Sequence, residues 1–147
     1  MSTRKSLSFE TTLYVRDTCL CLHVQRAARA LARRFDEVLR PLELTNGQFS
    51  LLMSLNRPEP PVLGSVARLL AMDRTTLTAA LKPLERRGLV KVAVDKKDKR
   101  GRRLSLTPPG HALLIAAMPL WKKTHAELDK LLPRSADALR ADLLALS

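Results

Sequence analysis

The residues best suited to chemistry in this sequence are two cysteines, three histidines and a dense run of lysine and arginine. Cys19 and Cys21 lie two positions apart, which on a helix turns their side chains roughly 200° from each other and argues against a simple local disulfide. His23, His111 and His125 are too scattered to form a metal-ligand spacing with each other or with the cysteines. We therefore expect reduced thiols, no metal site and no cofactor.

The basic run lies inside the chain. Six Lys or Arg fall between Lys96 and Arg103, and the wider stretch from Lys82 to Arg103 holds ten of them against three acids. The formal net charge of the 147-residue chain is +12. A positive field of this size favours a polyanionic partner, either nucleic acid or an anionic membrane surface.

Several classes of protein are disfavoured by the sequence. The longest uncharged run, Leu104 to Trp121, includes Pro108, Pro109 and Gly110, which would break a membrane helix. The apolar stretch "TCLCLHV" is too short for a secretory signal. There is no Gly-rich phosphate loop, nucleophile elbow or HExxH pattern. We expect a cytoplasmic protein that is not an enzyme and has no membrane partner.

Two short runs of period two flank the basic run. "LVKVAV", residues 89–94, precedes it, and "RLSL", residues 103–106, follows it. This arrangement predicts a β-hairpin whose loop carries the charge. The two strands would hold the basic loop in a fixed place, so that it projects as a wing instead of hanging as a tail.

Two short helices are predicted before the hairpin. Their apolar stripes, at 66–70 and 77–84, are separated by "AMD", in which Asp73 suits an N-cap. With Leu77, Leu81 and Leu84 inward, the second helix presents Thr75, Thr78, Ala79, Lys82 and Arg86 outward. Slim polar residues flanked by cations fit a helix that approaches base edges in a major groove.

Longer helices are predicted on both sides of this region. Apolar periodicity predicts a first helix over 14–39, and "TNGQ", residues 45–48, is a capping-box pattern that begins a short one. Thr107 and Pro108 begin a long helix, and a last one begins near Ser135. Since aromatic residues are only 3%, we expect a mainly α fold with a small antiparallel β-wing. The outer helices carry more apolar surface than one small lobe can bury.

The stretch "DRTTLTAALKPLERRGLVKVAVDKKDKRGRRLSLTPPG" resembles the recognition helix and wing of the MarR family of bacterial transcriptional regulators. The shared motifs are D-x-x-D-x-R at Asp95, Asp98 and Arg100, and L-T-x-x-G at Leu106, Thr107 and Gly110. The likeness covers roughly residues 14–132. It implies a single MarR-like domain over 1–147, with a winged helix-turn-helix lobe at 45–107 and dimerisation helices at 8–44 and 108–147.

The resemblance also implies a function and a set of site residues. A homodimer would bind double-stranded DNA at a pseudo-palindromic operator, as a repressor released by a small ligand. Arg100 would enter the minor groove, oriented by Asp98. The residues expected to contact DNA are Arg74, Thr75, Thr76, Thr78, Lys82, Arg86, Lys97, Lys99, Arg100 and Arg102.

The region around Cys21 is similar to the branch of the family that senses organic hydroperoxides, in which a cysteine near this position is oxidised. The two tyrosines that hydrogen-bond that cysteine correspond here to Phe35 and Asn46. We therefore expect Cys21 to react slowly and to lie buried, lining a ligand cavity or the dimer seam. A small aromatic or oxidant effector would bind near Gln25, Phe49 and Met53.

Three alternatives are carried forward. The first is a redox-sensing repressor that uses the thiol of Cys21. The second is a constitutive architectural DNA-binding protein without an effector. The third is an enzyme that works on an acidic polymer. A sequence-specific footprint with dyad symmetry would separate a regulator from the last two.

Overall fold

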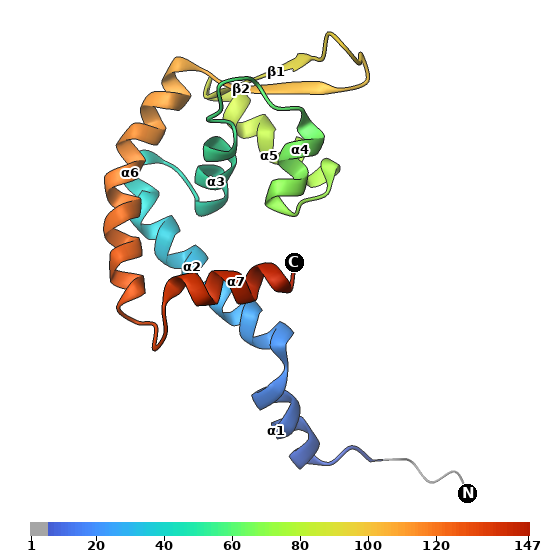
Figure 1. The fold of residues 1–147 in the computed structure, drawn as a ribbon, viewed down its shortest axis with the longest axis vertical. Coiled ribbons are helices and arrows are strands. Elements are labelled where there is room, and N and C mark those ends of the chain that lie inside the picture. The colour runs from blue at the N-terminus through green and yellow to red at the C-terminus, as the bar shows by residue number, and fades with distance from the viewer. Residues whose placement is uncertain (1–5) are drawn as a thin grey trace, which may run out of the picture. The chain divides into compact units, whose positions relative to one another are not determined.

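The computed structural model describes residues 6–147, which form seven α-helices, one 3-10 turn and one two-stranded antiparallel sheet (Figure 1). This confirms the prediction of a mainly α fold with a small β-wing. The chain divides into two compact units, one that ends at Arg34 and one that runs from Phe35 to Ser147. Within the described residues, no helix is both long enough and apolar enough to cross a membrane.

The first unit contains helix α1, Phe9–Thr18, and most of helix α2, Leu20–Leu39. The prediction of one continuous helix from residue 14 was wrong about where the helix begins and about its continuity. The chain becomes helical earlier because the Ser8 side chain caps α1 by accepting from the Thr11 amide at 3.3 Å. It leaves helical geometry at Cys19, which has ψ 112°. Just before this break, the Thr18 hydroxyl donates to the Tyr14 carbonyl at 2.7 Å, a side-chain bond that competes with helix continuation.

The second unit begins with the end of α2, followed by the 3-10 turn η1, Arg40–Leu42, and helix α3, Asn46–Ser54. The predicted capping box is confirmed. The Gln48 amide donates to the Thr45 hydroxyl at 3.1 Å, and the Thr45 amide donates to the Gln48 side chain at 3.1 Å. These two bonds satisfy amide groups that a helix start otherwise leaves unpaired.

The predicted helix pair and hairpin are also present. Helix α4, Leu63–Leu70, turns into α5, Arg74–Arg86, and the Asp73 carboxylate caps α5 by accepting from the Thr76 amide at 2.7 Å. This bond lowers the pKa of Asp73 below its ordinary value of 3.8. Strands β1, Val90–Val94, and β2, Arg102–Leu106, pair antiparallel, with Val90 opposite Leu106.

Helix α6, Pro108–Asp129, and helix α7, Ala136–Ala145, complete the chain. Both predicted starts are confirmed, because the Thr107 hydroxyl accepts from the Gly110 amide at 3.1 Å and the Ser135 hydroxyl from the Ala138 amide at 3.2 Å. Gly110 also lets the start of α6 lie directly against the backbone of Leu89, where an added Cβ would overlap the carbonyl. This contact joins α6 to Leu89, the residue just before β1.

The core of the second unit is mostly aliphatic. Its most deeply buried side chains come from α2, α3, α4, α5 and β2, namely Leu39, Leu52, Val66, Leu77, Leu84 and Leu104. Two rings border it, since Phe49 stacks on Trp121 with their centroids 6.3 Å apart. Burying several large aliphatic side chains at about 2 kcal/mol each gives the lobe a core without a disulfide.

The middle and the loop end of the hairpin are fixed by a third extended segment and an ion pair. The Leu104 amide donates to the Pro61 carbonyl at 3.0 Å, and Arg103 donates to the Pro60 carbonyl at 2.9 Å. Asp95, which is 7% exposed, accepts from the Lys97 amide at 3.2 Å and from Arg103 Nε at 3.3 Å. The Lys97 amide and then the Arg103 guanidinium lower the pKa of Asp95 below 3.8.

Gly110→Ala should destabilise the fold by about 1–3 kcal/mol, because the new methyl group must displace the Leu89 backbone. Urea unfolding followed by circular dichroism measures this change. Gly47→Ala is the matched control, since the nearest atom to a Cβ there is 4.0 Å away. Equal stability of the two variants would show that α6 does not need this close approach.

Asp95→Asn should lower the free energy of unfolding at neutral pH and lose this effect in acid. Because the folded-state pKa lies below 3.8, the ionised carboxylate stabilises the fold above that value, and the benefit is lost as pH falls through the lowered pKa. Urea unfolding across acid and neutral pH should show the two proteins converging in acid. Asp129→Asn is the control, because this exposed side chain can be changed with little effect on the fold.

Candidate nucleic-acid interface

The outward face of α5 is as predicted. Thr75, Thr78, Ala79, Lys82 and Arg86 are exposed, whereas Leu77, Leu81 and Leu84 are buried. The three leucines fix the rotation of the helix about its own axis. The small side chains are therefore presented together on one side, with the two cations towards the C-terminal half of that face.

The three threonines of α5 differ in what their hydroxyls can do. Thr76 donates to the Asp73 carboxylate at 2.9 Å and so belongs to the helix cap. Thr78 donates to the Arg74 carbonyl at 2.8 Å, which leaves its oxygen free to accept. Within residues 6–147 the Thr75 hydroxyl has no hydrogen-bond partner, so it can donate or accept.

The tip of the hairpin is a tight turn closed by Asp98. The Gly101 amide donates to the Asp98 carbonyl at 2.8 Å, and the Arg100 amide donates to the Asp98 carboxylate at 3.1 Å. Arg100 Nε lies 3.5 Å from the same carboxylate, while the Arg100 side chain stays 94% exposed. Asp98 therefore contacts both the backbone and the side chain of Arg100.

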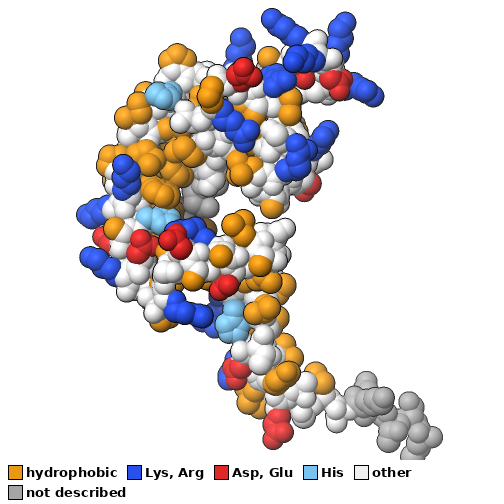
Figure 2. Space-filling model, viewed as in Figure 1, with side chains coloured by type: hydrophobic (Ala, Val, Ile, Leu, Met, Phe, Trp, Pro, Cys, Tyr) orange, Lys and Arg blue, Asp and Glu red, His pale blue; other side chains and the backbone are white. Residues whose placement is uncertain are grey.

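The other cations of the hairpin divide into two groups. Lys97, Lys99 and Arg100 are exposed, and Figure 2 shows Lys and Arg side chains projecting from this end of the lobe. Arg102, although exposed, turns its Nη1 towards the Gly101 carbonyl at 3.0 Å and the Lys99 carbonyl at 3.4 Å. Arg103 is held by Asp95 and Pro60. Arg102 and Arg103 are thus engaged in hydrogen bonds that hold the hairpin together.

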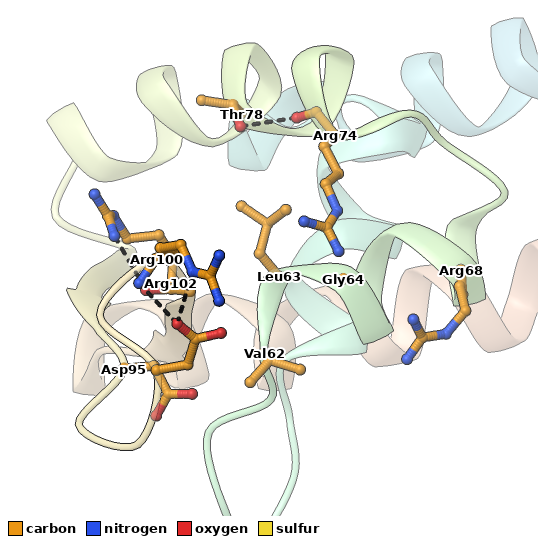
Figure 3. A pocket seen from close by; sticks show the side chains of 11 residues that line it. Val62, Leu63, Gly64, Arg68, Arg74, Thr78, Asp95, Arg100 and Arg102 are labelled. Carbon is orange, nitrogen blue, oxygen red and sulfur yellow. Dashed lines mark hydrogen bonds and ion pairs between the residues drawn. The ribbon is translucent and has the colours of Figure 1, made fainter.

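A groove of about 690 Å³ lies between the helix pair and the wing (Figure 3). Its polar lining is dominated by four arginines, Arg68, Arg74, Arg100 and Arg102, with Asp95 and Asp98 as the acids. Both acids already accept hydrogen bonds from the hairpin. The groove consequently offers guanidinium groups to an anionic chain, with Thr78 of α5 also on its lining.

Arg68 and Gly64 of α4 belong to this groove and were missed in the sequence. The Arg74 guanidinium lies over Gly64, 2.9 Å from the position a Cβ would take (Figure 3). Gly64 thereby leaves room for Arg74 to lie across the start of α4. A glycine ten residues before an arginine carries no recognisable signal in the sequence, because the turn at 71–73 creates the contact.

The predicted ligand-pocket residues are divided between the two units. Phe49 is buried against Trp121 and Met53 is half-buried beside the core, whereas Gln25 and Cys21 are exposed in the first unit. The expectation of a buried Cys21 is wrong for the single chain, where the less exposed cysteine is Cys19. Residues 6–147 contain no group of three His, Cys, Asp or Glu placed to hold a metal ion.

Comparisons with known proteins agree with this geometry. The model of the MarR family matches residues 44–101. The regulator SarZ of Staphylococcus haemolyticus is 28% identical over 67% of this chain and 69% of its own length. The regulator TtmR of Methylorubrum extorquens is 36% identical over 66% of this chain, which spans only half of that protein.

A solved structure extends the match to almost the whole chain. The transcriptional regulator MosR of M. tuberculosis, crystallised in complex with DNA, has a TM-score of 0.80 and 37% identity, covering 87% of this chain and 92% of its own. These relatives are all named as regulators, in agreement with the expectation that the chain is not an enzyme. The chain belongs to the MarR family of transcriptional regulators.

Proposed function

We propose that this regulator binds double-stranded DNA sequence-specifically, with α5 in a major groove and the wing at the adjacent minor groove. The observation that carries the proposal is the arginine-lined groove between these two elements. A phosphodiester strand that separates a major from a minor groove would lie in it, held by guanidinium groups that match phosphate geometry. Arg68 and Arg74 are the contacts expected from the helix pair.

Base readout is assigned to the start of α5. Thr75 and Thr78 are slim enough to let the helix approach base edges, and their hydroxyls can accept from adenine or cytosine amino groups. Lys82 and Arg86, farther along the same face, are placed to meet phosphates. Thr76 is assigned to the cap instead, since its hydroxyl already serves Asp73.

The wing is assigned to the minor groove. Arg100 extends from a turn that Asp98 closes, and its side chain is exposed. An extended guanidinium suits a narrow, A·T-rich minor groove, where the negative potential is strongest. Lys97 and Lys99 would contact the flanking backbone, and Arg102 would contribute charge while bound to the hairpin carbonyls.

The proposal includes a homodimer. Helix α7 has no buried residue, and Leu139, Leu143, Leu144 and Leu146 are 41–75% exposed. In the first unit, Leu20 and Leu31 of α2 are likewise exposed. Apolar surface of this extent fits burial against a second copy of the chain, which would place two lobes on an operator with dyad symmetry.

The dimer is proposed to act as a repressor that a small ligand releases by changing the distance between the lobes. Redox control through Cys21 is the second candidate, favoured by the exposure of this thiol in the single chain. Operator release by an organic hydroperoxide, compared between wild type and Cys21→Ser, separates the two. An architectural protein without an effector would give no dyad-symmetric footprint.

Substitutions in the wing and in the helix should have different effects on binding. Arg100→Ala should weaken binding chiefly at operators with a narrow A·T-rich minor groove, whereas Thr75→Ala should change base preference, at about 1–3 kcal/mol for the lost contact. Fluorescence anisotropy with a panel of duplexes measures both effects. Lys123→Ala, an exposed cation of α6, is the control. Unchanged affinity of Arg100→Ala on every duplex would contradict the assignment of the wing.

Leu143→Asp should lower dimerisation and DNA binding together. The carboxylate would have to be buried without a partner in the proposed interface, which costs several kcal/mol. Analytical ultracentrifugation should report a mass near that of one chain for the variant and twice that for the wild type. Asp142→Ala, one residue earlier on the same helix, is the control. A wild-type monomer that still binds the operator tightly would argue against the dimer.

A further inference from the structure

The last turn of the recognition helix is tied to the turn that follows α2. Arg87, the C-cap of α5, donates from Nη1 to the Glu43 carbonyl at 2.6 Å and from Nη2 to the Leu42 carbonyl at 3.4 Å. One guanidinium therefore bridges two consecutive carbonyls more than forty positions away in the chain. These carbonyls lie at the C-terminal end of η1, where the geometry of a helical turn leaves the last acceptors without a partner inside the turn.

The turn that Arg87 contacts is itself fixed to α2. The Leu44 amide donates to the Leu39 carbonyl at 3.3 Å, and Glu43 takes up the left-handed conformation with φ 54°. On the other side, the Asp36 carboxylate accepts from the amide and the side chain of Asn46 at 2.7 and 2.9 Å. The turn therefore follows the end of α2 as one piece, and Arg87 extends this connection to α5.

In residues 6–147, the two bonds of Arg87 are the hydrogen bonds that join the end of α5 to this turn. The buried leucines of α5 fix its rotation and its distance from the core, but apolar contacts resist tilting less specifically than directed hydrogen bonds. Helix α5 has 13 residues and so spans about 20 Å. A tilt of about 10° at the Arg87 end would move the other end by about 3 Å, close to the spacing of one base pair.

We infer that Arg87 is a positioning residue that fixes the angle of the recognition helix relative to the end of α2, and thereby the half-site spacing that the dimer accepts. The inference rests on the proposed function, because it presupposes a dimer with one recognition helix in each half-site. It assigns the spacing of the two helices to a residue that need not touch DNA. The guanidinium is already engaged by two carbonyls, whereas Arg86, its neighbour, belongs to the proposed DNA-facing side. Symmetric dimers read half-sites at a defined separation, so helix angle and spacing are linked.

The test uses operator duplexes selected from a random library with the full-length wild-type protein, then altered by adding or removing one base pair between the half-sites. The measured quantity is the ratio of dissociation constants for altered and native spacing. We expect a wild-type ratio on the order of tenfold or more, as for other errors in a binding site. Arg87→Ala should reduce this ratio at least about threefold while binding a single half-site as wild type does, because the readout face is intact.

Two further variants separate positioning from the other roles of an arginine. Arg87→Lys keeps the charge but cannot span two carbonyls with a planar fork, so its ratio should fall between those of wild type and Arg87→Ala. Lys91→Ala, an exposed cation just beyond, should keep the wild-type ratio. Urea unfolding checks that the compared proteins are folded at the assay temperature. If Arg87→Ala is not folded, the spacing ratio of Arg87→Lys is compared with that of the wild type instead.

The outcomes are distinct. A uniform loss of affinity on every duplex, including the single half-site, would make Arg87 a phosphate contact and overturn the inference. An unchanged spacing ratio in both Arg87 variants would do so as well. If the wild-type protein selects no duplex or shows no spacing preference, the proposed dimeric DNA-binding function is what fails.

Discussion

The structure of the lobe depends on how the wing accommodates its own charge. Six cationic side chains occupy residues 96–103, and like charges this close oppose a compact turn. The turn forms because Asp95 and Asp98 each accept a hydrogen bond from a backbone amide and form an ion pair with an arginine, so each carboxylate neutralises charge and closes the backbone at the same time. The lowered pKa of Asp95 reflects the same bonds. Without them the basic run would be the flexible arm that its composition alone suggests.

The same arrangement means that the net charge overstates how many cationic side chains are free for the proposed contacts with DNA. Arg103 neutralises Asp95 and holds the Pro60 carbonyl, Arg102 donates to hairpin carbonyls, and Arg87 holds the turn after α2. These arginines still contribute to the long-range field that attracts a polyanion. In the proposed function the contacts fall to fewer groups, with Thr75 and Thr78 at the bases, Arg100 in the minor groove and Arg74 at the phosphodiester strand. In protein–DNA recognition in general, charge governs the rate and salt dependence of association, whereas geometry governs which sequence is held.

The features that could be predicted from the sequence are those decided by residues close together in the chain. The caps at Thr45, Asp73, Thr107 and Ser135 each depend on a side chain and the amide three residues later. The hairpin followed from alternation, and the outward face of α5 from helical periodicity. The break at Cys19 was missed because apolar periodicity continues through it, while the competing bond from Thr18 to Tyr14 leaves no periodic signal.

Features that depend on distant parts of the chain could not be read in advance. Gly64 matters through Arg74, Arg103 through Pro60, and Arg87 through Leu42 and Glu43. In each case an arginine side chain contacts a backbone carbonyl or a glycine. The partner therefore contributes no side chain that a sequence pattern could reveal. Backbone carbonyls are also acceptors that substitution cannot easily remove. A guanidinium bound to them can therefore fix the position of an element while the side chains around it are free to change, which suits a scaffold whose recognition face must vary between regulators.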